Sequence, residues 1–111
     1  MEPTFFVYLK SNGQVSLVEI KDKPWKLLKK LIGGYPEQAR GPKALYKEYR
    51  PDHELAYLLN DEGGLLELDE NKFDSRFVGD LVLALKSDCE YVGFTRSEIE
   101  KLPIEFRMNR A

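Results

Sequence analysis

The segment from Phe77 to Leu85 constrains the fold more strongly than any other part of the chain. It follows a polar stretch at 69–76, contains five consecutive apolar residues at 81–85, and is the most hydrophobic run in the sequence. A short, continuous apolar run bounded by polar residues is typical of a strand covered on both faces. The run therefore predicts the central strand of a β-sheet.

A β-hairpin is predicted at the N-terminus. Residues 5–9 and 15–20 are rich in aromatic and β-branched side chains, and Asn12 and Gly13 lie between them. Asn-Gly tolerates the positive φ angles that a type I′ turn requires, so we expect this turn here.

Further strands are expected downstream. Residues 54–60 and 65–68 predict a second hairpin, which turns at 61–64, and one more short strand is expected at 91–94. The segment 35–51 is interrupted by prolines and glycine, and only residues 44–49 look strand-like or helical. We therefore expect a loop that contains one short strand there.

A short amphipathic helix is expected after the first hairpin. Asp22 can act as its N-cap, and Pro24 suits its first turn because the missing N–H is harmless there. Gly33 and Gly34 suit the left-handed conformation that ends a helix. The apolar positions at helical spacing, all expected in the core, are Trp25, Leu28, Leu31 and Ile32.

A second short helix is expected near the C-terminus. Thr95 and Glu98 have the spacing of a capping box, with a hydroxyl at the cap and a carboxylate three residues later. Pro103 ends this helix. Residues 104–107 then form either a last strand or a loosely packed tail.

Length and composition indicate the class of protein. The 111 residues, 42% of them hydrophobic, predict one α+β domain over 1–111 with a small mixed or antiparallel sheet. Cys89 is the only cysteine, which excludes an intrachain disulfide and favours a reducing compartment. The N-terminal segment has no basic lead, and its apolar run is too short for a signal peptide or a membrane span. We therefore expect a cytoplasmic protein without a membrane partner.

The charges are unevenly distributed along the chain. Residues 21–50 carry nine Lys or Arg against three Asp or Glu, whereas residues 51–90 carry three against eleven. The candidate basic patch consists of Lys26, Lys29, Lys30, Arg40, Lys43, Lys47 and Arg50. Such a patch can contact phosphate or an acidic partner, or it can be an ordinary solvated face.

No motif for catalysis, metal binding or cofactor binding is present in the sequence. His53 is the only histidine and lies in a polar turn, and acidic neighbours flank Cys89 and disfavour its thiolate form. One histidine and one cysteine do not make a zinc site, and the acidic turns lack calcium-loop spacing. Gly33-Gly34 and Gly63-Gly64 lack the further residues of nucleotide-binding signatures. An enzyme is the least favoured class, and we expect no catalytic residue, metal or cofactor.

Four short motifs, taken in order, resemble the family called domain of unknown function 3846, small proteins found mostly in tailed phages and bacterial mobile elements. Leu31-Ile32-Gly33-Gly34-Tyr35-Pro36-Glu37 is similar to its Gly-Gly-aromatic-x-Glu signature, and Asn60-Asp61-Glu62-Gly63-Gly64 to its Asp-Glu-x-Gly turn. A leucine-rich segment ending at Asn71 follows. Val78-Gly79-Asp80-Leu81-Val82-Leu83 resembles the family's Gly-Asp-hydrophobic strand, and Phe94-Thr95 with Glu98 resembles its closing element.

The resemblance covers residues 5–102 and implies a viral or mobile-element accessory protein in the host cytoplasm. Pro36 and the basic, aromatic stretch 43–50 depart from the family pattern. The candidate ligand or partner positions that the resemblance implies are Gly33, Gly34, Tyr35, Glu37, Asp61, Glu62, Gly63 and Asn71. The glycines are also explained by the backbone geometry of a helix end and a turn.

Three functions remain open from the sequence. The first is a non-enzymatic accessory protein that binds a host or viral protein. The second is a module that binds or sequesters a small, nucleotide-like ligand, and the third is a nucleic-acid-binding protein that uses the basic segment 21–50. The chain is expected to be a monomer or a small homo-oligomer, since edge strands such as 5–9 can pair between copies.

Overall fold

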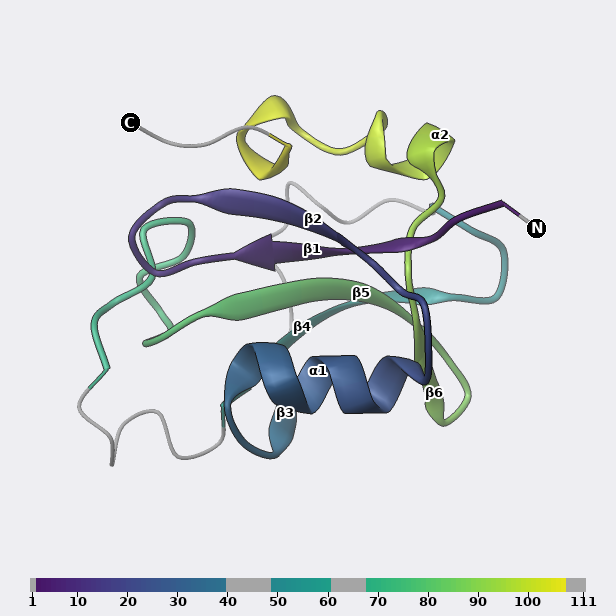
Figure 1. Ribbon diagram of the computed structural model, residues 1–111. Coiled ribbons are helices and arrows are strands. Elements are labelled where there is room, and N and C mark those ends of the chain that lie inside the picture. The colour runs from purple at the N-terminus through teal and green to yellow at the C-terminus, as the bar shows by residue number, and fades with distance from the viewer. Residues whose placement is uncertain (1, 40–48, 61–67, 108–111) are drawn as a thin grey trace.

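The structure, a computed structural model, describes residues 2–39, 49–60 and 68–107, and it has an antiparallel sheet with helices on both faces (Figure 1). This confirms the predicted α+β class. Of the two sheet types that were expected, mixed or antiparallel, the structure has the antiparallel one. The elements are β1 (Phe5–Leu9), β2 (Val15–Glu19), α1 (Pro24–Ile32), β3 (Pro36–Ala39), β4 (Glu54–Asn60), β5 (Leu81–Ser87), β6 (Glu90–Val92), α2 (Arg96–Ile99) and the 3₁₀ helix η2 (Ile104–Phe106). The strand order is β2-β1-β5-β4-β3, and β6 also pairs with β5.

The central strand β5 is covered on both faces. Residues 81–85 are completely buried, and β5 pairs with β1 on one side and β4 on the other. The predicted central strand is thus confirmed, although it begins at Leu81 rather than Phe77. Gly79, with φ of 78°, ends the preceding segment, where its N–H donates to the Asp69 carbonyl over 2.6 Å.

The first hairpin is confirmed, but its predicted type I′ turn is wrong. The Lys10 N–H donates to the Gln14 carbonyl over 2.9 Å, so the loop has three residues rather than two. In this loop Gly13 has φ of 96°, whereas Asn12 has no positive φ. The Asn12 side chain instead accepts a hydrogen bond from the Gln14 N–H at 3.0 Å, which stabilises a different turn.

Helix α1 covers one face of the sheet. Leu28 and Ile32 are buried in a cluster with Phe6, Leu58 and Val82 from three strands. The helix ends as predicted, because Gly33 takes the left-handed conformation and its N–H donates to the Lys29 carbonyl. The predicted N-cap is wrong: Lys23 occupies that position without a side-chain cap, while Pro24 begins the helix.

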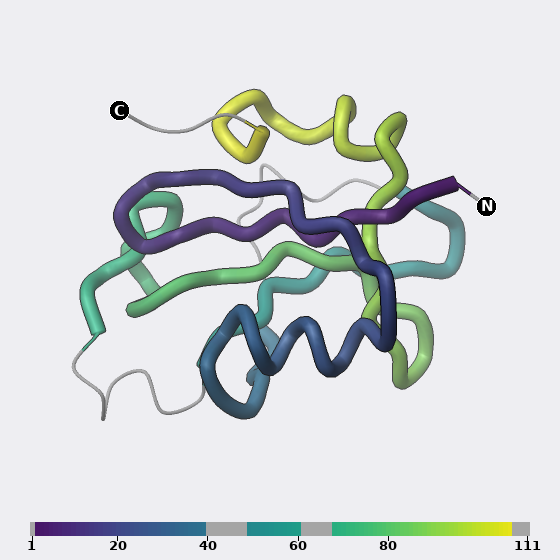
Figure 2. The backbone as a smooth tube through the Cα atoms, viewed as in Figure 1, coloured from purple at the N-terminus to yellow at the C-terminus, as the bar shows by residue number. Residues whose placement is uncertain are grey.

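The C-terminal segment covers the opposite face. In Figure 2 the yellow end of the chain lies across the sheet from α1, and Ile99, Leu102 and Phe106 are buried against the sheet there. The capping box of α2 is confirmed. Residues 104–106 form a 3₁₀ helix, neither the strand nor the loose tail, because Phe106 is anchored in the core.

The segment after α1 differs from the prediction. Residues 36–39 were expected in a loop but form β3, which pairs with β4. Strand β4 confirms the first half of the second hairpin, whereas its turn and most of its second strand fall at 61–67, outside the described residues. The strand-like stretch expected at 44–49 also lies outside them, apart from the buried Tyr49.

An ion pair joins the segment before β4 to α2. The Arg50 Nε donates to Glu98 Oε2 at 2.9 Å, and Arg50 Nη2 donates to Glu98 Oε1 and to the Gly93 carbonyl. A Cβ at Gly93 would lie 2.8 Å from the backbone N and O of Phe5, so only glycine permits this close approach of the two backbone segments.

Among the described residues, no helix has the length and hydropathy needed to cross a membrane.

Replacing Glu98 with Gln should destabilise the fold by about 2 kcal/mol at neutral pH, because Arg50 stays partly buried without a charged partner. Burial raises the pKa of Glu98, but hydrogen bonds from Arg50 and from the Thr95 N–H outweigh burial and hold this pKa below its usual range. Such a carboxylate stabilises the fold fully above its unfolded pKa of about 4.3 and loses this contribution as the pH falls through the lower folded value.

Urea unfolding measured at neutral pH and down to about pH 3 checks this expectation. The free energy of unfolding of Glu98→Gln should fall less steeply on acidification than that of the wild type. The variant Glu100→Gln, at the exposed residue that caps the C-terminal end of the same short helix, is the matched control and should follow the wild type. Identical slopes for wild type and Glu98→Gln would contradict the role of this ion pair.

Candidate functional site

Among residues 2–39, 49–60 and 68–107, the most exposed large aromatic side chains lie at the two ends of α1. Trp25 is 54% exposed and Tyr35, just after the helix, is 69% exposed. The prediction that Trp25 lies in the core is wrong. Its spacing from Leu28 and Ile32 is helical, but it lies in the first turn, where the three-residue strand β6 offers only partial cover.

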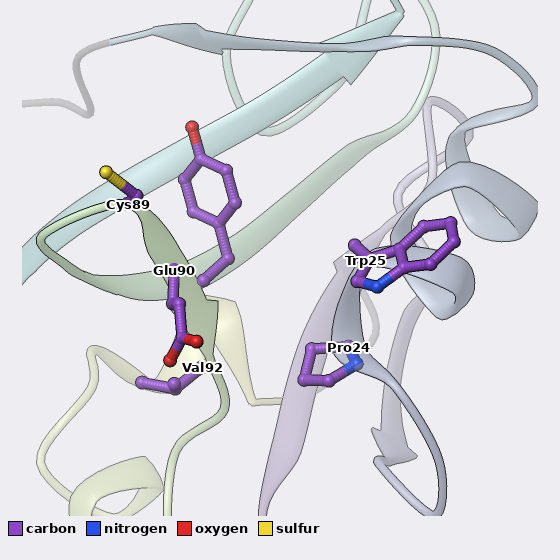
Figure 3. A pocket seen from close by; sticks show the side chains of 6 residues that line it. Pro24, Trp25, Cys89, Glu90 and Val92 are labelled. Carbon is purple, nitrogen blue, oxygen red and sulfur yellow. The ribbon is translucent and has the colours of Figure 1, made fainter.

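A small groove of about 180 Å³ separates Trp25 from the β5–β6 turn. Figure 3 shows Pro24 and Trp25 on the helix side, with Cys89, Glu90 and Val92 across the opening. Tyr91 also lines the groove, and its hydroxyl bonds to Gln38 Oε1 at 3.0 Å. Tyr91 is itself partly buried against the cluster under α1, so one wall of the groove is part of the packed core. These six residues are called the Trp25 groove below.

Lysines lie over both exposed rings. The Lys29 Nζ is 4.7 Å from the centre of the Tyr35 ring and 5.8 Å from that of Trp25, and Lys26 Nζ is 5.7 Å from Trp25. These are cation–π distances, which favour a shared arrangement of the four side chains. Trp25, Lys26, Lys29 and Tyr35 are called the aromatic–lysine surface.

The charges around this surface are of both signs. A second shallow groove of about 290 Å³ is lined by Lys21, Lys23, Lys26 and Lys30, but also by Glu19 and Asp22. Within the described ranges, no lysine of α1 forms an ion pair. The lysines are therefore available to a partner, although carboxylates interrupt their array.

The predicted basic patch is divided by the structure. Lys26, Lys29 and Lys30 lie exposed on α1, whereas Arg50 is held by Glu98 and Gly93. Its ion pair raises the pKa of Arg50 further, against the effect of burial. The remaining members, Arg40, Lys43 and Lys47, lie outside the described residues.

Residues at the C-terminal end of α1 line another groove, of about 370 Å³. Gly33, Asn60, Asp69 and Asp80 are among its lining residues. Asp80 accepts hydrogen bonds from the Tyr8 hydroxyl at 2.7 Å and from the Ser11 N–H at 2.8 Å. Burial, and then Asp80, raise the pKa of Tyr8, so the phenol stays protonated.

The candidate positions from the family resemblance do not gather in one cleft among the described residues. Gly33 lines the groove just described, and Gly34 packs on Asn60, where a Cβ would lie 2.9 Å from Nδ2. Tyr35 belongs to the aromatic–lysine surface, and Glu37 is exposed on β3. Asp61, Glu62 and Gly63 fall outside the described residues.

Asn71 has a structural role. It is 1% exposed, and its Nδ2 donates to the carbonyls of Leu9 and Gly79 at 3.0 and 2.9 Å. Its Oδ1 accepts from the Phe73 N–H at 2.8 Å. These bonds link the segment before β5 to the end of β1. Both polar atoms of the Asn71 side chain therefore bond within the protein rather than to a ligand.

No catalytic arrangement is visible in the described part of the chain. The His53 ring bonds to the Pro51 carbonyl at 2.8 Å, and Cys89 is exposed in the β5–β6 turn. Across 2–39, 49–60 and 68–107, no three His, Cys, Asp or Glu residues are grouped as metal ligands.

No family model, curated protein or solved structure matches this chain. The function of the site is therefore inferred from the geometry of its residues alone. Sequence reasoning missed Trp25, Tyr91 and Cys89 as neighbours. One feature of the sequence could have predicted the exposure of Trp25. It lies in the first turn of a helix whose next turn is rich in lysine, and an amphipathic side chain in such a position often keeps part of its surface in water.

Asn71→Ala should lower the free energy of unfolding by about 2–3 kcal/mol, since it leaves two buried carbonyls without donors. Denaturant unfolding measures this, with the nearby exposed Ser75→Ala as control. A change below about 0.5 kcal/mol would mean that Asn71 does not hold the fold.

Trp25, the only tryptophan, should report its exposure directly. We expect a red-shifted emission maximum in the folded protein and efficient quenching by iodide, which Lys26 and Lys29 attract. Trp25→Ala should lower the free energy of unfolding by no more than about 2–3 kcal/mol, because more than half of the side chain is already in water. A blue-shifted emission that iodide fails to quench would contradict this placement.

Proposed function

We propose that this protein is a non-enzymatic binding protein that docks a protein partner through the aromatic–lysine surface. The observation that carries the proposal is the joint exposure of Trp25 and Tyr35, 54% and 69%, on either side of Lys29. Tryptophan and tyrosine are enriched at protein interfaces and supply most of the binding energy there. Burying these rings against a partner removes apolar surface from water.

The pattern of charge favours a protein over a nucleic acid. Affinity for a phosphate backbone grows with the number of phosphates that Lys and Arg neutralise, and nearby carboxylates oppose it. Here Glu19 and Asp22 stand among the lysines of the neighbouring groove, and Glu90 lines the Trp25 groove. Aromatic residues surrounded by charges of both signs match the apolar centre and polar rim of a protein interface.

The groove at the end of α1 is poorly suited to a nucleotide. Asp69 and Asp80 line it, and the C-terminal end of a helix carries partial negative charge. Both features repel phosphate. The small-ligand alternative therefore has less support than the protein-binding function.

The resemblance to domain of unknown function 3846 adds the biological setting to the proposal. In that setting the protein is a viral or mobile-element accessory factor in the bacterial cytoplasm, and the partner is a host or viral protein. The aromatic–lysine surface includes Tyr35, which belongs to the Gly-Gly-aromatic-x-Glu stretch that carries the resemblance.

A capture experiment with matched variants tests this function. The full chain, immobilised through its C-terminus, should recover a specific protein from nuclease-treated bacterial lysate, and Trp25→Ala should reduce that recovery at least about tenfold. The control is Ile104→Ala, which removes a 63% exposed apolar side chain from the opposite layer and should leave recovery unchanged.

Lys29→Glu gives a second readout of the same surface. It should weaken recovery and reduce its dependence on salt, because one charge contact is reversed. Equal recovery by the wild type, Trp25→Ala and Lys29→Glu would refute docking at this surface. Loss of recovery on nuclease treatment alone would point to a nucleic-acid partner instead.

A further inference from the structure

The two sides of the Trp25 groove carry opposite charge. On the helix side, Lys26 and Lys29 lie over the Trp25 ring. On the other side, Cys89 stands between Asp88 and Glu90 in the β5–β6 turn. Asp88 also lines a polar hollow of about 290 Å³ with Asp52, Glu54 and Lys86. Lys86 Nζ also lies 5.9 Å from the centre of the Tyr91 ring on this second side. An apolar slot thus separates a basic side from a side on which Asp88 and Glu90 outnumber Lys86.

Such a surface is complementary to itself. A two-fold rotation about an axis that runs along the slot places the basic side of one copy on the acidic side of the other, twice over. The same rotation lays each Trp25 ring against the Cys89–Val92 side of the other copy, which covers part of its exposed surface. We propose that the occupant of the Trp25 groove is a second copy of this chain, in a two-fold symmetric dimer.

The charge pattern favours this occupant over a uniformly charged one. An acidic segment laid across the slot meets Asp88 and Glu90, and a basic segment meets Lys26 and Lys29, so each is repelled on one side. A fitting occupant needs an apolar centre between a negative and a positive side, and this chain itself presents that arrangement.

The dimer regulates the proposed function, and in this respect the inference rests on it. Trp25 belongs to both the groove and the aromatic–lysine surface, so a dimer of this geometry hides it from any other partner. Partner binding and self-association then exclude each other, and high protein concentration lowers the fraction of chain able to bind. Self-association itself requires no partner and is tested on the purified chain.

Charge reversal provides the decisive test, with sedimentation velocity over a range of concentrations. Lys26→Glu/Lys29→Glu makes both sides acidic, and Asp88→Asn/Glu90→Lys makes the second side basic. Asn is chosen at position 88 because it tolerates the φ of 50° found there. Each double variant alone should dimerise at least about tenfold more weakly than the wild type, whereas a mixture of the two should form heterodimers.

Cys89 allows the geometry to be checked by cross-linking. Because it is the only cysteine, a bismaleimide long enough to cross the slot can yield a covalent dimer only through Cys89 of both copies. Wild type should give this product in a concentration-dependent manner, and Trp25→Ala should reduce it at least about tenfold at equal concentration. The Ile104→Ala control should match the wild type.

Three results would overturn the dimer. The wild type could remain monomeric at all concentrations, the charge variants could self-associate as strongly as the wild type, or their mixture could fail to recover dimers although both variants show native circular dichroism. A monomeric wild type that still loses its captured protein on Trp25→Ala substitution would refute the dimer alone and leave the proposed function standing.

Discussion

The burial of β5 on both faces is the constraint on which the rest of the structure depends. Five consecutive apolar residues, 81–85, expose no surface at all, so a layer is required on each side of the sheet. On one side α1 supplies it, and on the other the C-terminal segment does, with Phe94, Ile99, Leu102 and Phe106. The sheet is therefore the middle of three layers (Figure 1).

The two layers differ in how completely they cover the sheet, and this difference produces the candidate site. The C-terminal layer is joined to the segment before β4 by Arg50, whose partners Glu98 and Gly93 flank the start of α2. Helix α1 has nine residues, of which Leu28 and Ile32 are buried. A helix this short does not cover its face of the sheet completely. Its first turn lies beside the short β6, so Trp25 keeps an exposed face and a groove opens next to it.

Local signals predicted the parts of the fold that depend on a few neighbouring residues. Gly33 as the end of α1 and the capping box at Thr95 were predictable because each is decided within one turn of helix. Strand β3 was not, since its polar sequence forms a strand only through pairing with β4. The exposure of Trp25 and the ion pair of Arg50 depend on residues more than forty positions away, such as Tyr91 and Glu98, which helical periodicity does not report.

The central claim is that β5, covered on both faces, supports an outer helix α1 that is less protected. Native-state hydrogen exchange tests this claim most directly. Amides of β5 and of its neighbours β1 and β4 should exchange only through global unfolding, with free energies of opening equal to the free energy of unfolding. Amides in the first turns of α1 should open with a free energy at least about 2 kcal/mol lower. Exchange from β5 that is as fast as exchange from α1, or faster, would contradict the account.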